Sequence, residues 1–190
     1  MIARRHALLT LSGLLLGGCG TPTRPLEIAT PEMELYQLRG WVPQALRRNV
    51  SLGAVQGGRE TSMWWGSQVS DQTLSQALQE SMRRLGLLPD LPEAGRYELR
   101  VQLLVLAQPR LPMSPEVIAS VRYTLAERAS GAALFERILR TSRSTGLGDS
   151  LNPQEQLRLA SEAAMRASIA ELVRELAPLQ LPPAAPAAAV

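Results

Sequence analysis

The stretch YELRVQLLVLA, residues 97–107, alternates apolar and polar side chains with a period of two. Such a period places every second side chain on the same side of an extended chain. The apolar positions on that side are Tyr97, Leu99, Val101, Leu103 and Val105. Residues 97–107 therefore predict a strand with one buried face.

A hairpin is predicted after this strand. A second alternating run ends in the turn ERASGA, where Gly131 can adopt a positive φ, and the stretch LFERILRTSRST follows at once. Two strands joined by so short a turn are expected to pair antiparallel. The apolar positions of the alternating run are Val117, Ala119, Val121, Tyr123 and Leu125.

The last strand of this hairpin carries apolar side chains on both sides. Leu134 and Ile138 face one way, and Phe135 and Leu139 face the other. The strand is therefore either covered on both faces or an edge strand guarded by arginines.

Helical spacing brackets the predicted strands. NVSLGAV, residues 49–55, predicts a first strand, and a helix capped by Ser70 or Asp71 follows it and ends at Gly86. A long helix over 153–176, capped by Asn152, closes the domain. The order β-α-β-β-β-α predicts an α+β fold, a two-layer sandwich with a mostly antiparallel sheet and two helices on one face.

The amino terminus has the three parts of an export signal. Arg4 and Arg5 form a positive end, residues 7–16 form an apolar core, and small residues precede Cys19, which is the single cysteine of the chain. The apolar core is too short to span a bilayer. Residues 1–18 are therefore predicted to be a signal peptide.

The residues Leu16-Gly17-Gly18-Cys19 resemble the lipobox of bacterial lipoproteins. The resemblance implies cleavage before Cys19, a diacylglycerol on its sulfur, and an acyl chain such as palmitate on its amine. Several acyl chains together hold a protein on a membrane essentially permanently. Gly20 stands where many inner-membrane lipoproteins carry aspartate, which implies the periplasmic face of the outer membrane of a Gram-negative bacterium. The alternative is an ordinary cleaved signal peptide.

Composition divides the rest of the chain. Residues 19–45 contain spaced prolines and are expected to form an extended tether from the lipidated Cys19. Residues 46–178 are expected to form one periplasmic α+β domain. Residues 179–190 are rich in alanine and proline, so we expect a disordered tail.

The residues that remain after cleavage exclude much chemistry. The chain has no lysine, and its one histidine, His6, leaves with the signal. Triads that need an imidazole, lysine dyads, and most zinc sites are therefore excluded. The 18 remaining arginines face 17 acidic residues and form no long run, so nucleic-acid binding is not expected. We expect no enzyme activity, no cofactor and no metal site; Asp71, Asp90 and Asp149 are interpreted as a helix cap, a turn and a loop residue.

Two longer stretches resemble known envelope proteins. VRYTLAERASGAALFERILRTSRST, residues 121–145, resembles the strand–turn–strand that precedes the last helix in the lipopolysaccharide-assembly lipoprotein and in the activator lipoproteins of penicillin-binding proteins. GGRETSMWWGSQVSDQTLSQAL, residues 57–78, resembles uncharacterised proteobacterial lipoproteins. The resemblance implies a small lipoprotein that faces the periplasm and serves a larger envelope machine.

The loop at 57–67 is the candidate partner-binding segment. Met63, Trp64 and Trp65 place large apolar side chains between a strand and a helix. Methionine and tryptophan are favoured at protein interfaces. The alternative is that one or both tryptophans fold back onto the core.

Three functions are compatible with the sequence. The first is a non-catalytic, lipid-anchored accessory protein that binds another envelope component, expected to be a protein, through a sheet edge or the tryptophan loop. The second is a component of lipid or lipopolysaccharide transport, in which Arg137, Arg140 and Arg143 bind phosphates; otherwise these arginines only guard a sheet edge. The third is a cell-wall enzyme that uses two carboxylates in a cleft.

Overall fold

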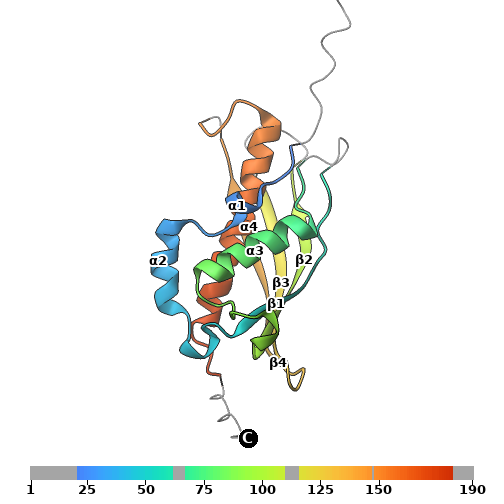
Figure 1. The fold of residues 1–190 in the computed structure, drawn as a ribbon. Coiled ribbons are helices and arrows are strands. Elements are labelled where there is room, and N and C mark those ends of the chain that lie inside the picture. The colour runs from blue at the N-terminus through green and yellow to red at the C-terminus, as the bar shows by residue number, and fades with distance from the viewer. Residues whose placement is uncertain (1–20, 62–66, 110–115, 147, 182–190) are drawn as a thin grey trace, which may run out of the picture.

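The computed structural model describes residues 21–61, 67–109, 116–146 and 148–181, except for the side chain of Leu35. It contains one four-stranded sheet in the order β1-β2-β3-β4 (Figure 1). The strands are β1 (Val50–Gln56), β2 (Tyr97–Ala107), β3 (Glu116–Glu127) and β4 (Ala133–Ser144). The two long helices are α3 (Asp71–Arg84) and α4 (Pro153–Leu176). The predicted α+β order β-α-β-β-β-α is confirmed.

Strand pairing follows from the connections. β2 pairs antiparallel with β3, and β3 pairs antiparallel with β4 across the predicted short turn. β1 pairs parallel with β2, with Val50 opposite Tyr97, because α3 carries the chain back across the sheet between them. The sheet is therefore mixed, with two antiparallel pairs and one parallel pair.

The helices begin and end where their capping residues predict. The Ser70 hydroxyl accepts the N–H of Thr73 at 3.1 Å, and Gly86, just beyond α3, has φ +72°. The Asn152 side chain accepts the N–H of Gln154 at 2.9 Å at the start of α4. Figure 1 shows α3 and α4 on the same face of the sheet. Within the described ranges, no helix is long and apolar enough to cross a bilayer.

The core lies between these helices and the sheet. The Tyr123 hydroxyl on β3 lies 3.0 Å from the Ser168 hydroxyl on α4, and burial raises the pKa of Tyr123. This hydrogen bond links the sheet to α4 inside the core. The largest buried side chains there include Tyr97, Leu99, Tyr123, Leu125, Met165 and Ile169.

One residue of the opening stretch departs from its predicted face. The pairing of β2 with β3 shifts register between Leu103 and Val105. A bulge of this kind reverses the alternation of the residues beyond it. Val105 is consequently 49% exposed, so its predicted burial is wrong.

The predicted extended tether is wrong for residues 21–45. Helix α1 (Pro25–Ile28), helix α2 (Glu32–Trp41) and the 3-10 turn η1 (Gln44–Leu46) occupy this segment. The prolines initiate or flank these short helices instead of extending the chain, since proline at a first helical position lacks only an N–H that has no helical partner. The side chains of Ile28, Leu38, Val42 and Leu46 are all buried in the core.

The boundary of the predicted tail also moves. Leu179 and Leu181 are half-buried and pack on the core, so residues 179–181 belong to the domain. Residues 182–190 lie outside the described chain.

Substitutions in α1 test whether the amino-terminal segment is part of the folded domain. Ile28→Ala removes a side chain that is 0% exposed, and we expect it to lower the free energy of unfolding by about 2–5 kcal/mol. Leu26→Ala, in the same helix but 68% exposed, serves as the control and is expected to change it by less than about 0.5 kcal/mol. Urea denaturation of residues 20–190 measures both, and equal effects would contradict the packing of α1.

Candidate functional site

The predicted lipidation site and the tryptophan loop are known here through their flanking residues. Cys19, Met63, Trp64 and Trp65 lie outside the described chain. Thr21 follows Cys19 by two residues, and Thr61 and Ser67 flank the loop. Whether the tryptophans are buried or exposed therefore stays a prediction.

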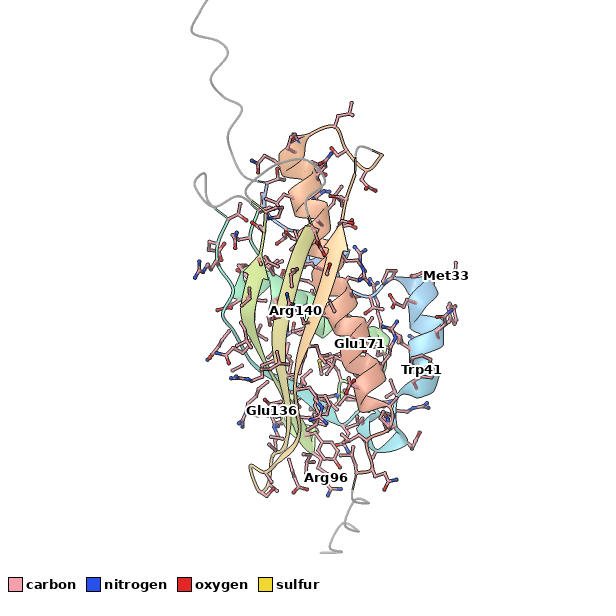
Figure 2. All side chains as sticks on the ribbon, turned by 180° about the vertical axis from the view of Figure 1, so that it is seen from behind. Met33, Trp41, Arg96, Glu136, Arg140 and Glu171 are labelled. Carbon is pink, nitrogen blue, oxygen red and sulfur yellow. The ribbon has the colours of Figure 1, made fainter. Side chains whose placement is uncertain are left out.

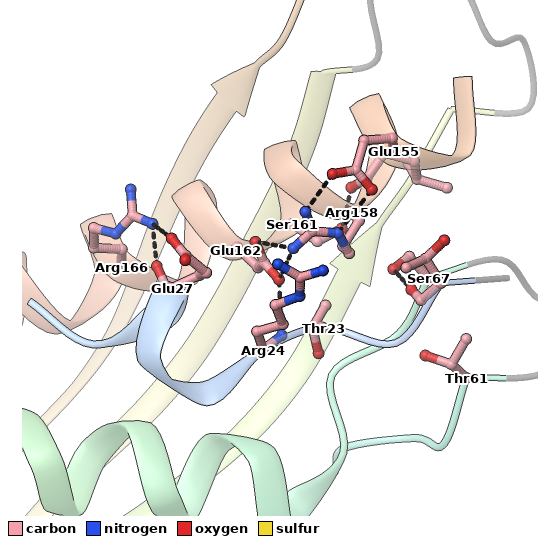
Figure 3. Close-up of polar contacts among 12 residues, drawn as sticks. Thr23, Arg24, Glu27, Thr61, Ser67, Glu155, Arg158, Ser161, Glu162 and Arg166 are labelled. Carbon is pink, nitrogen blue, oxygen red and sulfur yellow. Dashed lines mark hydrogen bonds and ion pairs between the residues drawn. The ribbon is translucent and has the colours of Figure 1, made fainter. Parts of the chain in front are cut away.

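These flanking residues meet at one end of the domain. The Ser67 hydroxyl donates to the carbonyl oxygen of Thr21, and the Thr23 hydroxyl donates to the carbonyl oxygen of Gln68 at 2.9 Å. Thr61 also donates to that carbonyl oxygen, at 3.2 Å. We call the part of the domain around Thr21, Thr23, Thr61, Ser67 and Gln68 the anchor end (Figure 3).

A side-chain amide network joins the anchor end to the sheet and to α4. The Gln68 amide donates to the Gln108 side-chain oxygen at 3.1 Å, just beyond the end of β2. The Gln108 amide in turn donates to the Ser161 hydroxyl of α4, also at 3.1 Å. Strand, loop and helix are therefore fixed against one another at this end.

Buried charges hold the amino-terminal segment against α4. The Glu162 carboxylate, 1% exposed, accepts the main-chain N–H of Arg24 at 2.7 Å and two bonds from Arg158 at 2.6 and 2.8 Å (Figure 3). Arg158, itself 4% exposed, also donates to Glu155. One helical turn further along α4, Arg166 donates to the main-chain carbonyl of Glu27 in α1.

The electrostatics of the two glutamates differ because their burial differs. Burial raises the pKa of Glu162, although the Arg24 N–H and the Arg158 guanidinium oppose the shift. The hydrogen bond from Arg158 lowers the pKa of the more exposed Glu155. A charge so far removed from water is costly unless it is paired. One of the three N–H bonds to Glu162 comes from the main chain of Arg24. The buried carboxylate therefore fixes the position of residue 24 in the folded domain.

The three predicted arginines all lie on β4, an outer strand of the sheet. Phe135, Leu139 and Thr141 face the helices, so period two places Arg137 and Arg143 on that side and Arg140 on the open face (Figure 2). The structure does not bring the three together on one face, as a shared phosphate site requires.

Arg137 and Arg143 contact the main chain of the outer strand. Each donates to the carbonyl oxygen of the residue before it, Glu136 at 3.1 Å and Ser142 at 2.7 Å. Ile138 on the open face is 54% exposed, so β4 is covered on one face only. This position agrees with the edge-strand interpretation of these arginines.

An exposed apolar stripe on α2 was not predicted from the sequence. Met33 is 83% exposed, Tyr36 81% and Trp41 49%, and Figure 2 shows Met33 and Trp41 on a helix that stands at the side of the domain. Leu26 in α1 is also exposed, at 68%. We call Met33, Tyr36 and Trp41 the α2 stripe. The available signal was that EMELYQLRGW carries more large apolar side chains than one buried face holds, since Leu38 is buried and the three residues of the stripe are not.

The aspartates that remained as candidates for chemistry have separate structural partners. Asp71 accepts the Gly58 N–H at 2.6 Å, and Asp149 accepts the Gly146 N–H at 2.8 Å. Asp90 pairs with Arg48 at the surface. Within the described residues, no cluster of side chains suited to a metal ion is found.

A surface pocket of about 540 Å³ lies beside β1 and α3. Gln79, Arg83, Asp90 and Arg128 are among its lining residues. Its lining mixes three charged side chains with apolar ones such as Leu52 and Leu88, so it is not a predominantly apolar pocket of the kind that suits a lipid tail.

No known family model matches the chain, and no curated protein matches it either. Two crystal structures share its fold. A Xanthomonas campestris protein of the DUF330 family has 13% sequence identity and a TM-score of 0.50, with 72% of this chain and 89% of that chain covered. A protein of Caulobacter crescentus described as a candidate lipoprotein has 15% identity and a TM-score of 0.50, with 75% and 95% covered.

At this identity the likeness shows the fold alone. The fold is thus one that occurs in proteins of Gram-negative bacteria, one of them described as a candidate lipoprotein. Neither structure is named for lipopolysaccharide assembly or for the activation of penicillin-binding proteins, so that part of the sequence resemblance stays a prediction.

The contribution of the buried Glu162 to stability can be compared with that of Glu155, the more exposed partner of the same Arg158. Glu162→Ala leaves the Arg24 N–H and the Arg158 guanidinium without their buried acceptor, and we expect it to lower the free energy of unfolding by about 3 kcal/mol or more. Glu155→Ala removes a carboxylate that is 32% exposed from the same guanidinium, and a loss of about 1 kcal/mol or less is expected. Chemical denaturation measures both, and a Glu162 variant no worse than the Glu155 variant would rule out this role.

The edge interpretation of the arginines predicts self-association. Replacing Arg137 and Arg143 together by threonine removes two charges from an outer strand, and we expect larger species in sedimentation velocity than for the native chain at the same concentration. Arg83→Thr with Arg174→Thr removes the same charge from helix surfaces and should leave the sedimentation profile unchanged. Identical sedimentation profiles for the two double variants would mean that Arg137 and Arg143 do not prevent self-association through β4.

Proposed function

We propose that this protein is a lipid-anchored accessory protein of the Gram-negative cell envelope, without catalytic activity, that binds another envelope component, namely a protein. The observation that carries the proposal is the exposed α2 stripe on a domain in which the Thr21 carbonyl, two positions after Cys19, accepts the Ser67 hydroxyl. The outer membrane, on its periplasmic face, is the proposed location, because Gly20 follows the cysteine.

The anchor is supported by the lipobox and by the fold. Residues 16–19 carry the lipobox pattern directly after a signal core. The fold occurs in a Caulobacter crescentus protein described as a candidate lipoprotein.

A protein partner is supported by the chemistry of the α2 stripe. Tyrosine, tryptophan and methionine are the side chains enriched at the centre of protein interfaces. Met33 and Tyr36 are each more than four-fifths exposed, although their helix is fixed to the core by the buried Leu38. A rigid helix presenting large apolar side chains suits a groove on a partner.

The alternative functions have less support. A role in lipid or lipopolysaccharide transport would use Arg137, Arg140 and Arg143, which the fold distributes over two faces of β4. A cell-wall enzyme would need two carboxylates facing one cleft, whereas Asp71 and Asp149 each accept a main-chain N–H of a separate loop.

Replacement of the predicted lipid attachment site tests the anchor. Cys19→Ser removes the sulfur that would carry the diacylglycerol. We expect the variant to leave the outer-membrane fraction and to be found as soluble periplasmic protein or as uncleaved precursor. Mass spectrometry of the amino-terminal peptide of the native protein should show the added lipid, and density separation of the membranes identifies which membrane holds it. A native peptide without lipid would refute the anchor.

In-cell crosslinking from the α2 stripe tests the partner. A photoreactive residue at Tyr36 should capture one dominant protein, whereas the same residue at Glu136, exposed on the open face of the sheet, should not. Adducts of lipid or lipopolysaccharide from position 36 would favour the transport function instead. No adduct above that of the Glu136 control would contradict the proposed role of the stripe.

A further inference from the structure

We propose that the anchor end is a membrane-contact surface: the domain rests on the bilayer through this end, and Leu151 and Val105 meet the lipid headgroup region. This inference rests on the proposed lipidation of Cys19. It goes beyond it by assigning a second contact with the bilayer, made by the folded domain itself.

The chain between the lipidated residue and the folded domain is short. Cys19 precedes Thr21 by two residues, and the Thr21 carbonyl already accepts the Ser67 hydroxyl. Two extended residues span at most about 7 Å between Cα atoms. Helix α4, with its 24 residues, is about 36 Å long. The attachment is therefore several times shorter than the domain that it holds.

The attachment cannot lengthen by detachment of residues 21–24 from the domain, because these residues are hydrogen-bonded to it. The Thr23 hydroxyl is bonded to the Gln68 carbonyl, and the Arg24 N–H is bonded to the buried Glu162. Releasing residues 21–24 would leave the Arg158–Glu162 pair without one of its donors inside the protein. The lipid is consequently held close to one fixed point on the domain surface.

Exposed apolar side chains lie at the same end of the domain as that point (Figure 1). Leu151, next to the Asn152 that caps α4, is 84% exposed, and the adjacent Ser150 carbonyl is fixed by the Gln156 amide at 2.6 Å. Val105, 49% exposed because of the bulge in β2, lines a surface depression together with Gln68 of the anchor end and the exposed Arg59. At this depression an apolar side chain lies beside a cation, a combination found on surfaces that lie in the headgroup region of a bilayer.

The consequence is a fixed orientation. Figure 1 shows the amino-terminal end of α4 and the first described residues at one end of the molecule, and the turn between β3 and β4 at the opposite end. With the anchor end on the bilayer, that turn points away from the membrane, and α2 stands at the side of the domain. A partner of the α2 stripe would then approach parallel to the membrane surface.

The experiment uses the full lipidated protein in vesicles of phosphatidylethanolamine and phosphatidylglycerol that contain spin-labelled quencher lipids. In the lipidated protein the sulfur of Cys19, the single cysteine, carries the diacylglycerol, so an introduced cysteine is the only free thiol. Leu151→Cys carries an environment-sensitive fluorophore, and Val105→Cys provides a second position at the same end. Leu91→Cys is the matched control, since Leu91 is 59% exposed and next to the segment whose Glu93 carbonyl accepts Arg128, at the end with the β3–β4 turn.

We expect the quencher lipids to lower the emission at position 151 or 105 about twofold or more, and to leave that at position 91 unchanged. Equal, unquenched emission at all three positions, in protein whose amino-terminal peptide carries the lipid mass, would overturn the membrane-contact surface and leave the lipid anchor intact. A peptide without lipid would overturn both.

Discussion

The pairing of the buried Glu162 is the interaction on which the rest of this structure depends. A carboxylate that is 1% exposed requires partners inside the protein, and it finds them in Arg158 on its own helix and in the main-chain N–H of Arg24. The second partner is 138 residues away in sequence. The pair thus selects one position for the chain just beyond Cys19, and α1 and α2 follow from that position.

With residues 21–24 fixed, the segment predicted as a tether becomes part of the domain. Ile28 and Leu38 then complete a core that is continuous with the sheet. The same packing holds the α2 stripe in one place, which matters for binding. A preformed surface loses less conformational entropy on association than a flexible segment does. A stripe on an extended tether would have had to order itself at that cost.

The sequence predicted those parts of the fold that local patterns determine. Period two identified β2 and β3, and the side chains of Ser70 and Asn152 identified the starts of both long helices. The amino-terminal segment could not be identified in this way, because spaced prolines are compatible both with an extended chain and with short helices. Glu155, Arg158 and Glu162 have the spacing of an ordinary solvated helix face, so only the long-range contact with Arg24 reveals that Glu162 is buried. The lipobox needed no tertiary information, whereas the α2 stripe and the anchor end depend on it.

The fold also bears on how a partner would bind. Two modes were open, strand addition at a sheet edge and insertion of apolar side chains into a pocket. On β4 the guanidinium groups of Arg137 and Arg143 donate to main-chain carbonyls of their own strand, and charged side chains along an outer strand disfavour the approach of another strand. On α2, Met33 and Tyr36 share one side of the helix at the i, i+3 spacing, and the charged Glu32 and Arg39 flank Tyr36. The charges on β4 and the exposed apolar side chains of α2 thus support the α2 stripe, rather than the β4 edge, as the proposed partner surface.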